Sequence, residues 1–313
     1  MAAMQAPPPD PAATAAVGTA AGSGGQPAEG PVREASLWSD AWRQLRRNPL
    51  FLGSAVLIAL FTLMAIVPGL FTRADPRACD LTNSLVRPSA EHWFGFDLQG
   101  CDYYSKVVHG ARVSMTIGIA TVAGTALVAV VLGTLAGFYG GFVDTVIARL
   151  TDVWFALPTL LGAVVVLAVL GGKGLAQLTF VLVIFGWPTM TRLMRSAVLS
   201  VRDMEYVTAA RALGAGDLRL MWRHILPNAL APVIVYGAIR VGIVIAAEAT
   251  LSFLGLGLQL PAISWGLMIA GAQSRLLTAP HLLLFPGLFL SLTVLAFVLL
   301  GDALRDALDP RLR

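Results

Sequence analysis

The amino-acid sequence predicts an all-α integral membrane protein with six transmembrane helices and with both termini in the cytoplasm. Of the 313 residues, 57% are hydrophobic and only 13% are charged, whereas soluble proteins carry about 25% charged residues. The apolar residues form runs long enough to cross a bilayer. Lys and Arg are concentrated in alternate connecting segments, which predicts the orientation. The net charge of +4 comes from arginines that flank the apolar runs, so we expect no nucleic-acid partner.

The N-terminal third of the chain is expected to hold a tail, one span and an outer loop. Residues 1–38 are rich in Ala, Pro, Gly and Ser, which predicts a disordered cytoplasmic tail. They show no basic start followed by an apolar stretch, so we expect no cleavable signal peptide. Residues 39–72 contain the first span, an uncharged run between Arg47 and Arg73 that would act as an uncleaved anchor. Residues 73–111 form the predicted extracytoplasmic loop.

The other five spans are predicted within residues 112–303, and residues 304–313 form the predicted cytoplasmic C-terminus. The second run ends in a Gly-rich break at residues 137–141, and glycines also close the third. In order, these runs extend from Arg112 to Asp144, from Asp152 to Gly171, from Lys173 to Arg192, from Asn228 to about Leu258 and from about Leu282 to Leu300.

The distribution of Lys and Arg predicts which side the connecting segments face. Six spans put both termini on one side of the membrane. If the termini are cytoplasmic, the cytoplasmic segments contain about twice as many Lys and Arg residues as the outer segments. The excess of positive charge in cytoplasmic loops therefore favours cytoplasmic termini, and it also places the polar segment 203–227 in the cytoplasm.

Two short helices are predicted within the segment 203–227. In the first, from about Asp203 to Leu213, one face holds Tyr206, Ala209, Ala210 and Leu213. Gly214 is expected to close this helix in the left-handed conformation. Asp217 is the predicted N-cap of the second helix, and Pro227 is expected to force a break before the next span. In the second helix one face holds Leu218, Met221, Trp222 and Ile225. Periodicity leaves two interpretations open: a loop lying on the bilayer surface with Trp222 at the headgroups, or a docking element for a cytoplasmic partner.

A resemblance to a known family favours the docking element. Ala209, Ala210, Gly214, Leu226 and Pro227 have the spacing of the EAA loop of ABC importer permeases, which reads E-A-A, three residues, Gly, nine residues, I-x-L-P. Thr208 occupies the position of the Glu, and His224 occupies that of the Ile. The segment resembles the dipeptide/oligopeptide/nickel branch of that family. The resemblance implies a coupling helix that sits in a groove of an ATPase subunit. The residues expected at this contact are Thr208, Ala209, Ala210, Arg211, Gly214, His224, Leu226 and Pro227. Glu205, three residues before the motif's Glu position, is a candidate for the polar contact.

Two further segments carry the same resemblance, so that it covers about residues 40–310. They are residues 92–112, which resemble the family's stretch before the second span, and residues 247–266, which contain Glu248, Pro261 and Trp265. Together the three segments are similar to the "C" type permease, with the type I ABC importer permease fold in the cell membrane. The resemblance implies a "B" type permease partner, an extracytoplasmic solute-binding protein and two cytoplasmic ATPases that bind ATP and Mg.

The sequence itself carries no recognisable catalytic or metal-binding pattern. It contains no G-x-x-x-x-G-K-[ST] phosphate loop, so we expect no cofactor on this chain and no enzyme activity. Its four histidines are dispersed without metal-ligand spacing. The expected function is half of the translocation pathway of an ATP-driven peptide importer. A permease for nickel or another small solute, an autonomous channel or secondary transporter, and a membrane scaffold stay as alternatives.

Both cysteines of the chain, Cys79 and Cys101, lie in the predicted outer loop. This side of the membrane is oxidising, so a disulfide between them is the leading hypothesis, and two free thiols are the alternative. The aromatic residues of the same loop either rest at the membrane interface or contact the binding protein.

Two charged residues, Arg240 and Glu248, lie within the fifth apolar run. Ionisable groups at this depth usually face protein or water. Eight residues apart on a helix, they are separated by about 80° and ~12 Å, so we expect no direct pair. Arg240 lies either on the translocation path or paired with the partner permease or another span, and Glu248 is expected to have a structural or gating role. Prolines at 158, 188, 232 and 286 can kink helices and free carbonyl groups toward a cavity, and ordinary helix packing is the alternative explanation for them.

Overall fold

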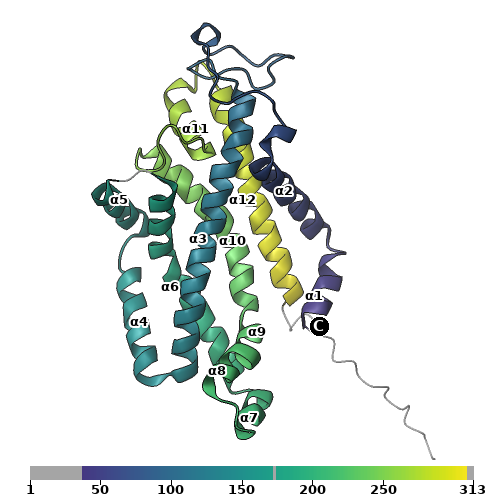
Figure 1. Ribbon diagram of the computed structural model, residues 1–313, viewed down its shortest axis with the longest axis vertical. Coiled ribbons are helices and arrows are strands. Elements are labelled where there is room, and N and C mark those ends of the chain that lie inside the picture. The colour runs from purple at the N-terminus through teal and green to yellow at the C-terminus, as the bar shows by residue number, and fades with distance from the viewer. Residues whose placement is uncertain (1–36, 172–173, 309–313) are drawn as a thin grey trace, which may run out of the picture. The chain divides into compact units, whose positions relative to one another are not determined.

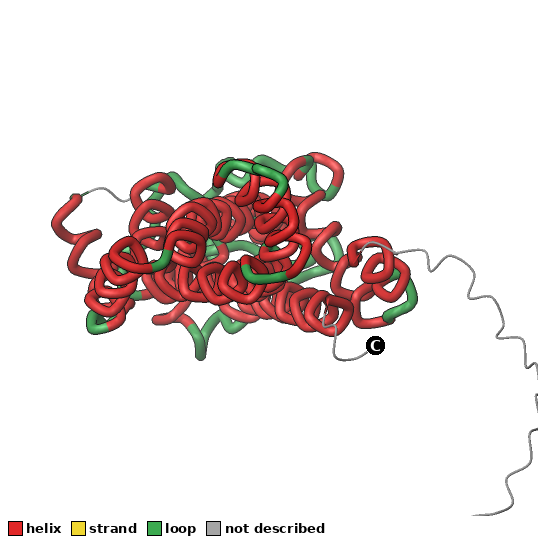
Figure 2. The backbone as a smooth tube through the Cα atoms, turned by 90° about the horizontal axis from the view of Figure 1, so that it is seen from below, coloured by secondary structure: helices red, strands yellow, loops and turns green. Residues whose placement is uncertain are grey.

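The computed structural model describes residues 37–171 and 174–308, and these residues form helices joined by loops (Figures 1 and 2). Of the predicted tail 1–38, only Leu37 and Trp38 are described, and they begin the first helix. The longer helices are α1 (Leu37–Leu45), α2 (Pro49–Ile66), α3 (Tyr103–Tyr139), α4 (Gly141–Phe155), α5 (Thr159–Leu170), α6 (Leu175–Arg202), α7 (Glu205–Ala212), α10 (Ala231–Phe253), α11 (Trp265–Ala272) and α12 (His281–Leu308). Short helical turns are η1 (Pro68–Leu70), η2 (Leu81–Asn83), α8 (Asp217–Arg219), η3 (Leu220–Ile225), α9 (Leu226–Ala229) and η4 (Gln273–Arg275).

Four described helices, α2, α3, α10 and α12, are long and apolar enough to cross a bilayer. A fifth candidate is α4 together with α5, which meet at an angle of 86°. The third predicted run is therefore the second half of a broken element. The break falls at Pro158, which is the N-cap of α5, because proline disfavours helical backbone at the residue before it. The 28-residue α6 is long enough to cross a bilayer, but it is not among these candidates.

The ends of the helices follow local sequence signals. Asn48 caps α2 by accepting the backbone N–H of Leu50 at 2.9 Å, and Pro49 occupies the first turn. Asp102 caps α3 through the N–H of Ser105 at 2.7 Å. At the other end, α3 stops at Gly140 with φ 66°, within the predicted Gly-rich break.

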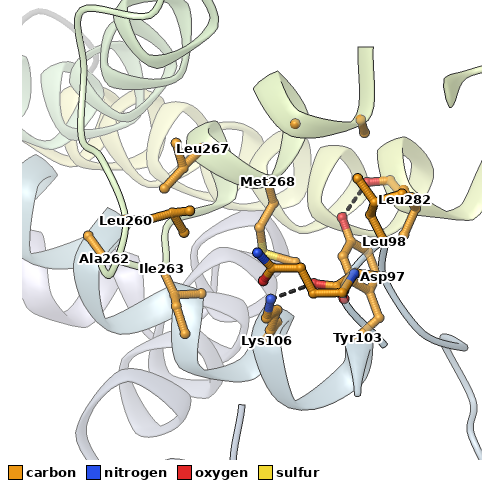
Figure 3. A pocket seen from close by; sticks show the side chains of 13 residues that line it. Asp97, Leu98, Tyr103, Lys106, Leu260, Ala262, Ile263, Leu267, Met268 and Leu282 are labelled. Carbon is orange, nitrogen blue, oxygen red and sulfur yellow. Dashed lines mark hydrogen bonds and ion pairs between the residues drawn. The ribbon is translucent and has the colours of Figure 1, made fainter. Parts of the chain in front are cut away.

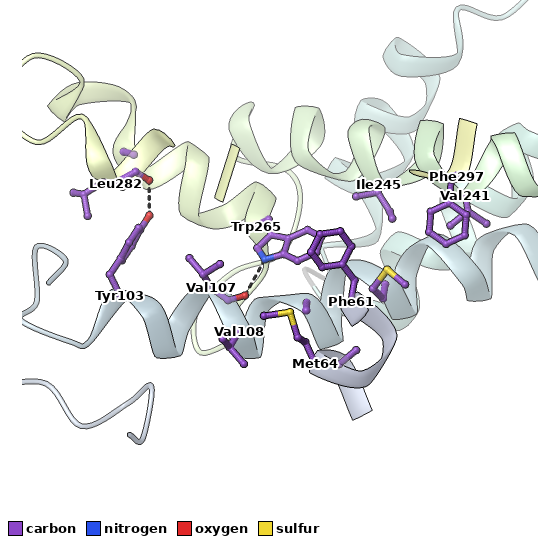
Figure 4. Close-up of a cluster of buried hydrophobic side chains, with 14 of the residues drawn as sticks. Phe61, Met64, Tyr103, Val107, Val108, Val241, Ile245, Trp265, Leu282 and Phe297 are labelled. Carbon is purple, nitrogen blue, oxygen red and sulfur yellow. Dashed lines mark hydrogen bonds between the residues drawn. The ribbon is translucent and has the colours of Figure 1, made fainter. Parts of the chain in front are cut away.

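Buried apolar residues gather in separate clusters along the bundle. The largest joins α2, α3, α10, α11 and α12 around Trp265, which is fully buried (Figure 4). The indole Nε1 of Trp265 donates to the carbonyl oxygen of Val107 at 2.9 Å, and its ring meets Phe61 edge-on at a centroid distance of 5.9 Å. A Cβ on Gly110 would lie 3.1 Å from this indole, so the small residue lets α11 approach α3.

The two prolines inside long helices do not leave open carbonyl groups. Pro188 in α6 removes the N–H that would pair with the carbonyl of Ile184, and the indole Nε1 of Trp154 donates to that oxygen at 2.8 Å. Pro286 in α12 likewise removes the N–H that would pair with the carbonyl of Leu282, and the Tyr103 hydroxyl donates to that oxygen at 2.5 Å (Figure 4). The expectation of free carbonyls was wrong at both sites, because an aromatic donor from another helix replaces the lost backbone donor.

Candidate functional site

The segment 203–227 connects α6 to α10 at one end of the bundle, where Figure 1 places α7 and α8. Its first helix, α7, ends in a Schellman motif centred on Gly214, which has φ 84°. The N–H of Ala215 reaches the carbonyl of Ala210 at 3.1 Å, and the N–H of Gly214 reaches that of Arg211 at 3.0 Å. The structure thus confirms that Gly214 closes this helix.

The second half of the segment differs from its predicted form. Gly216, with extended backbone, is the N-cap of α8, whereas Asp217 is already helical, so the prediction that Asp217 is the cap was wrong. The following residues, Leu220–Ile225, form a π-helical stretch. Pro227 lies in the first turn of α9, where no helical N–H is needed, and the predicted break before the next span follows at Leu230, between α9 and α10.

A buried apolar cluster attaches the segment to the bundle. Val207 of α7 is fully buried and packs in one cluster with Leu220 and Ile225, and this cluster extends to Val198 and Val201 of α6. Arg211 also lies over the ring of Phe138, near the end of α3, at 5.9 Å. The face predicted for α7 did not include Val207. Val207 lies three residues before Ala210, however, so both residues are on one side of the helix. α7 is thereby packed against α6 and in contact with the end of α3.

Polar contacts hold the two halves of the segment together. The Nδ2 group of Asn228 donates to the carbonyl of His224 at 2.9 Å and to the hydroxyl of Tyr206 at 3.0 Å. The Tyr206 hydroxyl in turn donates to the same His224 carbonyl at 3.3 Å. Partial burial raises the pKa of the Tyr206 hydroxyl, while the hydrogen bond from Asn228 acts in the opposite direction.

The predicted coupling residues divide between an outward and an inward set. Leu226 is buried, and Ala210 and His224 are half-buried. The hydroxyl of Thr208 donates to the carbonyl of Met204 within its own helix at 3.3 Å. Pro227 is exposed. The other exposed members, together with the neighbouring Leu213, form what we call the α7 surface: Glu205, Thr208, Ala209, Arg211, Leu213 and Gly214. Leu213, with 89% of its surface accessible, is its most exposed apolar residue.

Leu218 and Trp222 belong to a different surface. They are 67% and 66% exposed and line an apolar hollow of about 200 Å³ against Leu127, Val131 and Leu135 of α3. Met221 and Ile225, expected on the same helical face, are instead buried. The π-helical geometry of Leu220–Ile225 accounts for this division, because it changes the angle between successive side chains.

Arg240 and Glu248 lie apart, as their helical spacing predicts. Glu248 is fully buried, and its Oε1 accepts the hydroxyls of Ser252 at 2.8 Å and Ser264 at 2.9 Å. Ser264 is also the N-cap of α11, since its Oγ accepts the N–H of Leu267. A Cβ on Gly266 would lie within 3 Å of both carboxylate oxygens. Glu248 thus joins the end of α10 to the start of α11.

Arg240 projects from α10 toward α3 and α6. A Cβ on Gly186 of α6 would lie 3.2 Å from the Nη2 of Arg240 and 2.7 Å from the Cγ2 of Thr125 on α3. The side chain is half-buried. Among the described residues, none forms a hydrogen bond or an ion pair with it.

The outer loop, at the opposite end of the bundle in Figure 1, is compact. A disulfide joins Cys79 to Cys101, with their Cα atoms 4.0 Å apart. Gly100 has φ 71°, and a Cβ there would lie 1.8 Å from the carbonyl oxygen of Asp80. The N–H of Thr82 donates to the Asp80 carboxylate and lowers the pKa of this exposed group. The loop is therefore held by the covalent bond and by close backbone packing.

An ion pair between Asp97 and Lys106 lines a cavity of about 190 Å³ between the outer loop and α11 (Figure 3). The two side chains are only 14% and 13% exposed. Leu260, Met268 and Leu282 form apolar walls. The cavity has no unpaired charge, so it does not by itself define a binding site for a charged ligand.

Ion pairs fasten α4 to α6 near the other end. The guanidinium of Arg195 binds the carboxylate of Asp144 in a bidentate manner, with one contact of 2.6 Å. Arg192 binds Asp152 at 2.5 Å. With the bond from Trp154 to Ile184, these contacts link α4 to α6 at three heights.

Comparison with known proteins defines the class of the molecule. Residues 129–313 match the family described as "Binding-protein-dependent transport system inner membrane component", and residues 36–88 match "N-terminal TM domain of oligopeptide transport permease C". The chain therefore belongs to the binding-protein-dependent permeases of ABC importers, as a multi-pass protein of the cell membrane.

The curated relatives place the chain among the C subunits of that family. It is 39% identical over 287 residues to the dipeptide transport system permease protein DppC of Alkalihalophilus pseudofirmus, covering 92% of this chain and 94% of that one. The oligopeptide transport system permease protein OppC of Bacillus subtilis is 40% identical, covering 89% and 91%. The glutathione transport system permease protein GsiD of Pectobacterium atrosepticum is 38% identical, covering 88% and 92%.

A solved structure shares the fold. The inward-facing MetNI methionine ABC transporter matches with a TM-score of 0.54 and 17% identity, covering 65% of this chain and 96% of that one.

Proposed function

We propose that this chain is the C-type permease of an ATP-driven peptide importer and that the α7 surface is its contact with a cytoplasmic ATPase. A B-type permease would supply the other half of the translocation path, and an outer binding protein would deliver the peptide. ATP and Mg would be bound by two ATPase subunits. The observation that carries the coupling role is the combination of an exposed α7 surface with the buried anchor Val207 directly behind it.

The buried anchor Val207 gives a physical route by which a displacement of α7 would reach the membrane helices. Closure of the ATPases would displace α7, and the cluster around Val207 would carry the displacement into α6. The ion pairs of Arg192 and Arg195 would then carry it on to α4. Packed helices shift as units because their interfaces are close-packed. Alternating access would follow from a rigid-body movement of these helices.

We further propose six crossings with cytoplasmic termini, with α6 as the additional crossing and the α4–α5 pair as one. In support, α1, the end of α12 and α7 lie at the same end of the bundle in Figure 1, and the disulfide-bonded loop lies at the other. The proposed regions are the tail 1–38, the first span within 39–72, the outer loop 73–111, the core 112–303 and the C-terminus 304–313.

A charge placed on the α7 surface tests the coupling role. Ala209 is exposed, so Ala209→Arg should fold normally but block a close docking contact. Ala90, exposed in the outer loop, provides the matched control Ala90→Arg. We expect Ala209→Arg to lose co-purifying ATPase and peptide-stimulated ATP hydrolysis, while Ala90→Arg keeps the ATPase. If Ala209→Arg retains both, the α7 surface is not the coupling contact.

The names of the relatives support peptides as the substrate, and two alternatives make different predictions. A nickel or small-solute permease would be driven by its own binding protein with that solute and not with peptides. An autonomous channel or secondary transporter would move solute in vesicles that lack ATPase subunits. Uptake in proteoliposomes with and without the ATPases, using peptide and Ni²⁺ in parallel, distinguishes the three.

A further inference from the structure

A polar layer crosses the middle of the bundle where α3, α6 and α10 meet. Thr121 is the central residue of α3, Gly186 lies near the centre of α6, and Arg240 lies near the centre of α10. Together with Thr125, we call these residues the mid-span layer. Contacts tie them together, because Gly186 lies against both Arg240 and Thr125, and the Thr125 hydroxyl donates to the carbonyl of Thr121 at 3.0 Å.

The mid-span layer lies between the buried residues of two apolar clusters that share the same three helices, and Val122 of α3 packs against both clusters. On the α7 side, the cluster contains Ala129, Met190 and Val233. On the outer side, the other cluster contains Ile117, Leu182 and Val244. The polar residues therefore interrupt an otherwise apolar helix junction, at a depth where charge is costly.

The layer contains two polar groups without partners among the described residues. One is the guanidinium of Arg240, which has five N–H donors and is half-buried. The other is the hydroxyl oxygen of Thr121, which is buried without a hydrogen bond. By contrast, Arg192, Arg195 and Arg202, nearer the end of α6, all have partners. A half-buried cation that has no partner among the described residues is free to bind an acceptor carried by another molecule.

We propose that Arg240 binds the carboxylate of the substrate as it passes the middle of the membrane. This inference rests on the proposed function. The cargoes that name the relatives are dipeptides, oligopeptides and glutathione. All of these share a carboxylate, the group that a planar guanidinium binds in a bidentate manner. The same charge repels divalent cations, so the site selects peptides against nickel.

The test compares one peptide in two forms, with a free C-terminal carboxylate and with a C-terminal amide. The complete complex, with both permeases, both ATPases and binding protein, is reconstituted in proteoliposomes. Both peptides are supplied at concentrations that saturate the binding protein. The binding protein is the same in all samples, so a change in the acid-to-amide uptake ratio between variants arises in the membrane subunits. The variants are Arg240→Gln, Arg240→Lys and the control Arg149→Gln, which removes a side chain that is 80% exposed.

We expect Arg240→Gln to lower the acid-to-amide ratio by about tenfold or more, because a hydrogen-bonded charge pair is lost. Arg240→Lys should retain part of the preference, and Arg149→Gln should retain all of it. An unchanged ratio in Arg240→Gln overturns the proposal. So does an equal fall for both peptides, or a loss of co-purifying B-type permease, since Arg240 would then serve assembly. If the wild-type complex moves neither peptide, the proposed function itself fails.

Discussion

At the scale of single residues, Glu248 is a structural connector. Its Oε1 accepts hydroxyls from Ser252, one helical turn away, and from Ser264, across the turn to α11. Ser264 uses the same oxygen atom both to donate to Glu248 and to cap α11. This arrangement favours a structural role over direct contact with substrate, and its second oxygen, Oε2, is buried without a partner among the described residues.

Replacement of Glu248 separates the hydrogen bonds from the charge. Glu248→Ala leaves two buried hydroxyls without an acceptor and should destabilise the protein by about 2–4 kcal/mol. Glu248→Gln keeps an acceptor at Oε1 and should cost about 1 kcal/mol or less. Thermal unfolding of the purified complex measures both. Equal losses of stability in the two variants would show that the ionised carboxylate, and not its hydrogen bonds, is required.

Gly214 and Gly216 form a natural pair for testing backbone conformation. Neither has an atom within 4 Å of a Cβ built on it, but Gly214 has φ 84° whereas Gly216 has φ −70°. Gly214→Ala should therefore cost about 1–2 kcal/mol in the stability of the segment 203–227. Gly216→Ala should cost less, about 0.5 kcal/mol, because alanine adopts this φ without strain but is a poorer N-cap than glycine. Hydrogen exchange of the α7 amides reports the difference, and equal exchange in both variants would contradict it.

At the scale of the helices, the Trp154 donor compensates for the backbone N–H that Pro188 lacks. Trp154→Phe removes the donor to Ile184 and should cost about 1–3 kcal/mol. Pro188→Ala restores a backbone donor, so Trp154→Phe should cost less in that background. A double-mutant cycle in thermal unfolding gives the coupling energy, expected near 1 kcal/mol. A coupling of zero would mean that the indole acts only through packing.

The outer loop is expected to depend on its covalent bond. The disulfide closes a loop with a sequence separation of 22, which corresponds to about 3 kcal/mol in the chain-entropy model. In intact membranes we expect Cys79 and Cys101 to react with a maleimide only after reduction. Equal labelling with and without reductant would show two free thiols instead.

Sequence patterns predicted helices best where the signal is local. The break at Gly140 and the closure of α7 at Gly214 follow from glycine alone. Contacts between distant parts of the chain were not accessible in this way. The bond from Ser264 to Glu248 and the burial of Val207 both depend on how helices pack, and the donors to the proline-freed carbonyls come from residues 30 and 179 positions away. The face of Leu220–Ile225 was misassigned because its π-helical geometry departs from the assumed period of 3.6.

At the scale of the whole molecule, six crossings and cytoplasmic termini predict a pattern of accessibility. Single substitutions to cysteine at Gln44, Leu213 or Asp306 should not react with a membrane-impermeant maleimide in intact cells. Cysteines at Leu81 and Leu277, which are 75% and 96% exposed, should react. The native pair, joined in a disulfide, should not contribute to the signal. If positions 44 and 306 differ in accessibility, the number of crossings is odd, and α6 or the α4–α5 pair does not span.

The aromatic donors at the proline kinks also constrain how such sequences evolve. Where Pro188 is replaced, the carbonyl of Ile184 regains a backbone N–H donor, and the hydrogen bond from Trp154 is no longer needed. Where Trp154 is lost first, the carbonyl of Ile184 has no hydrogen-bond donor until the proline changes as well. The same reasoning applies to Tyr103 and Pro286. Related sequences should therefore contain both the proline and its aromatic donor or neither of them. Where both are lost, the proline should change before the aromatic residue.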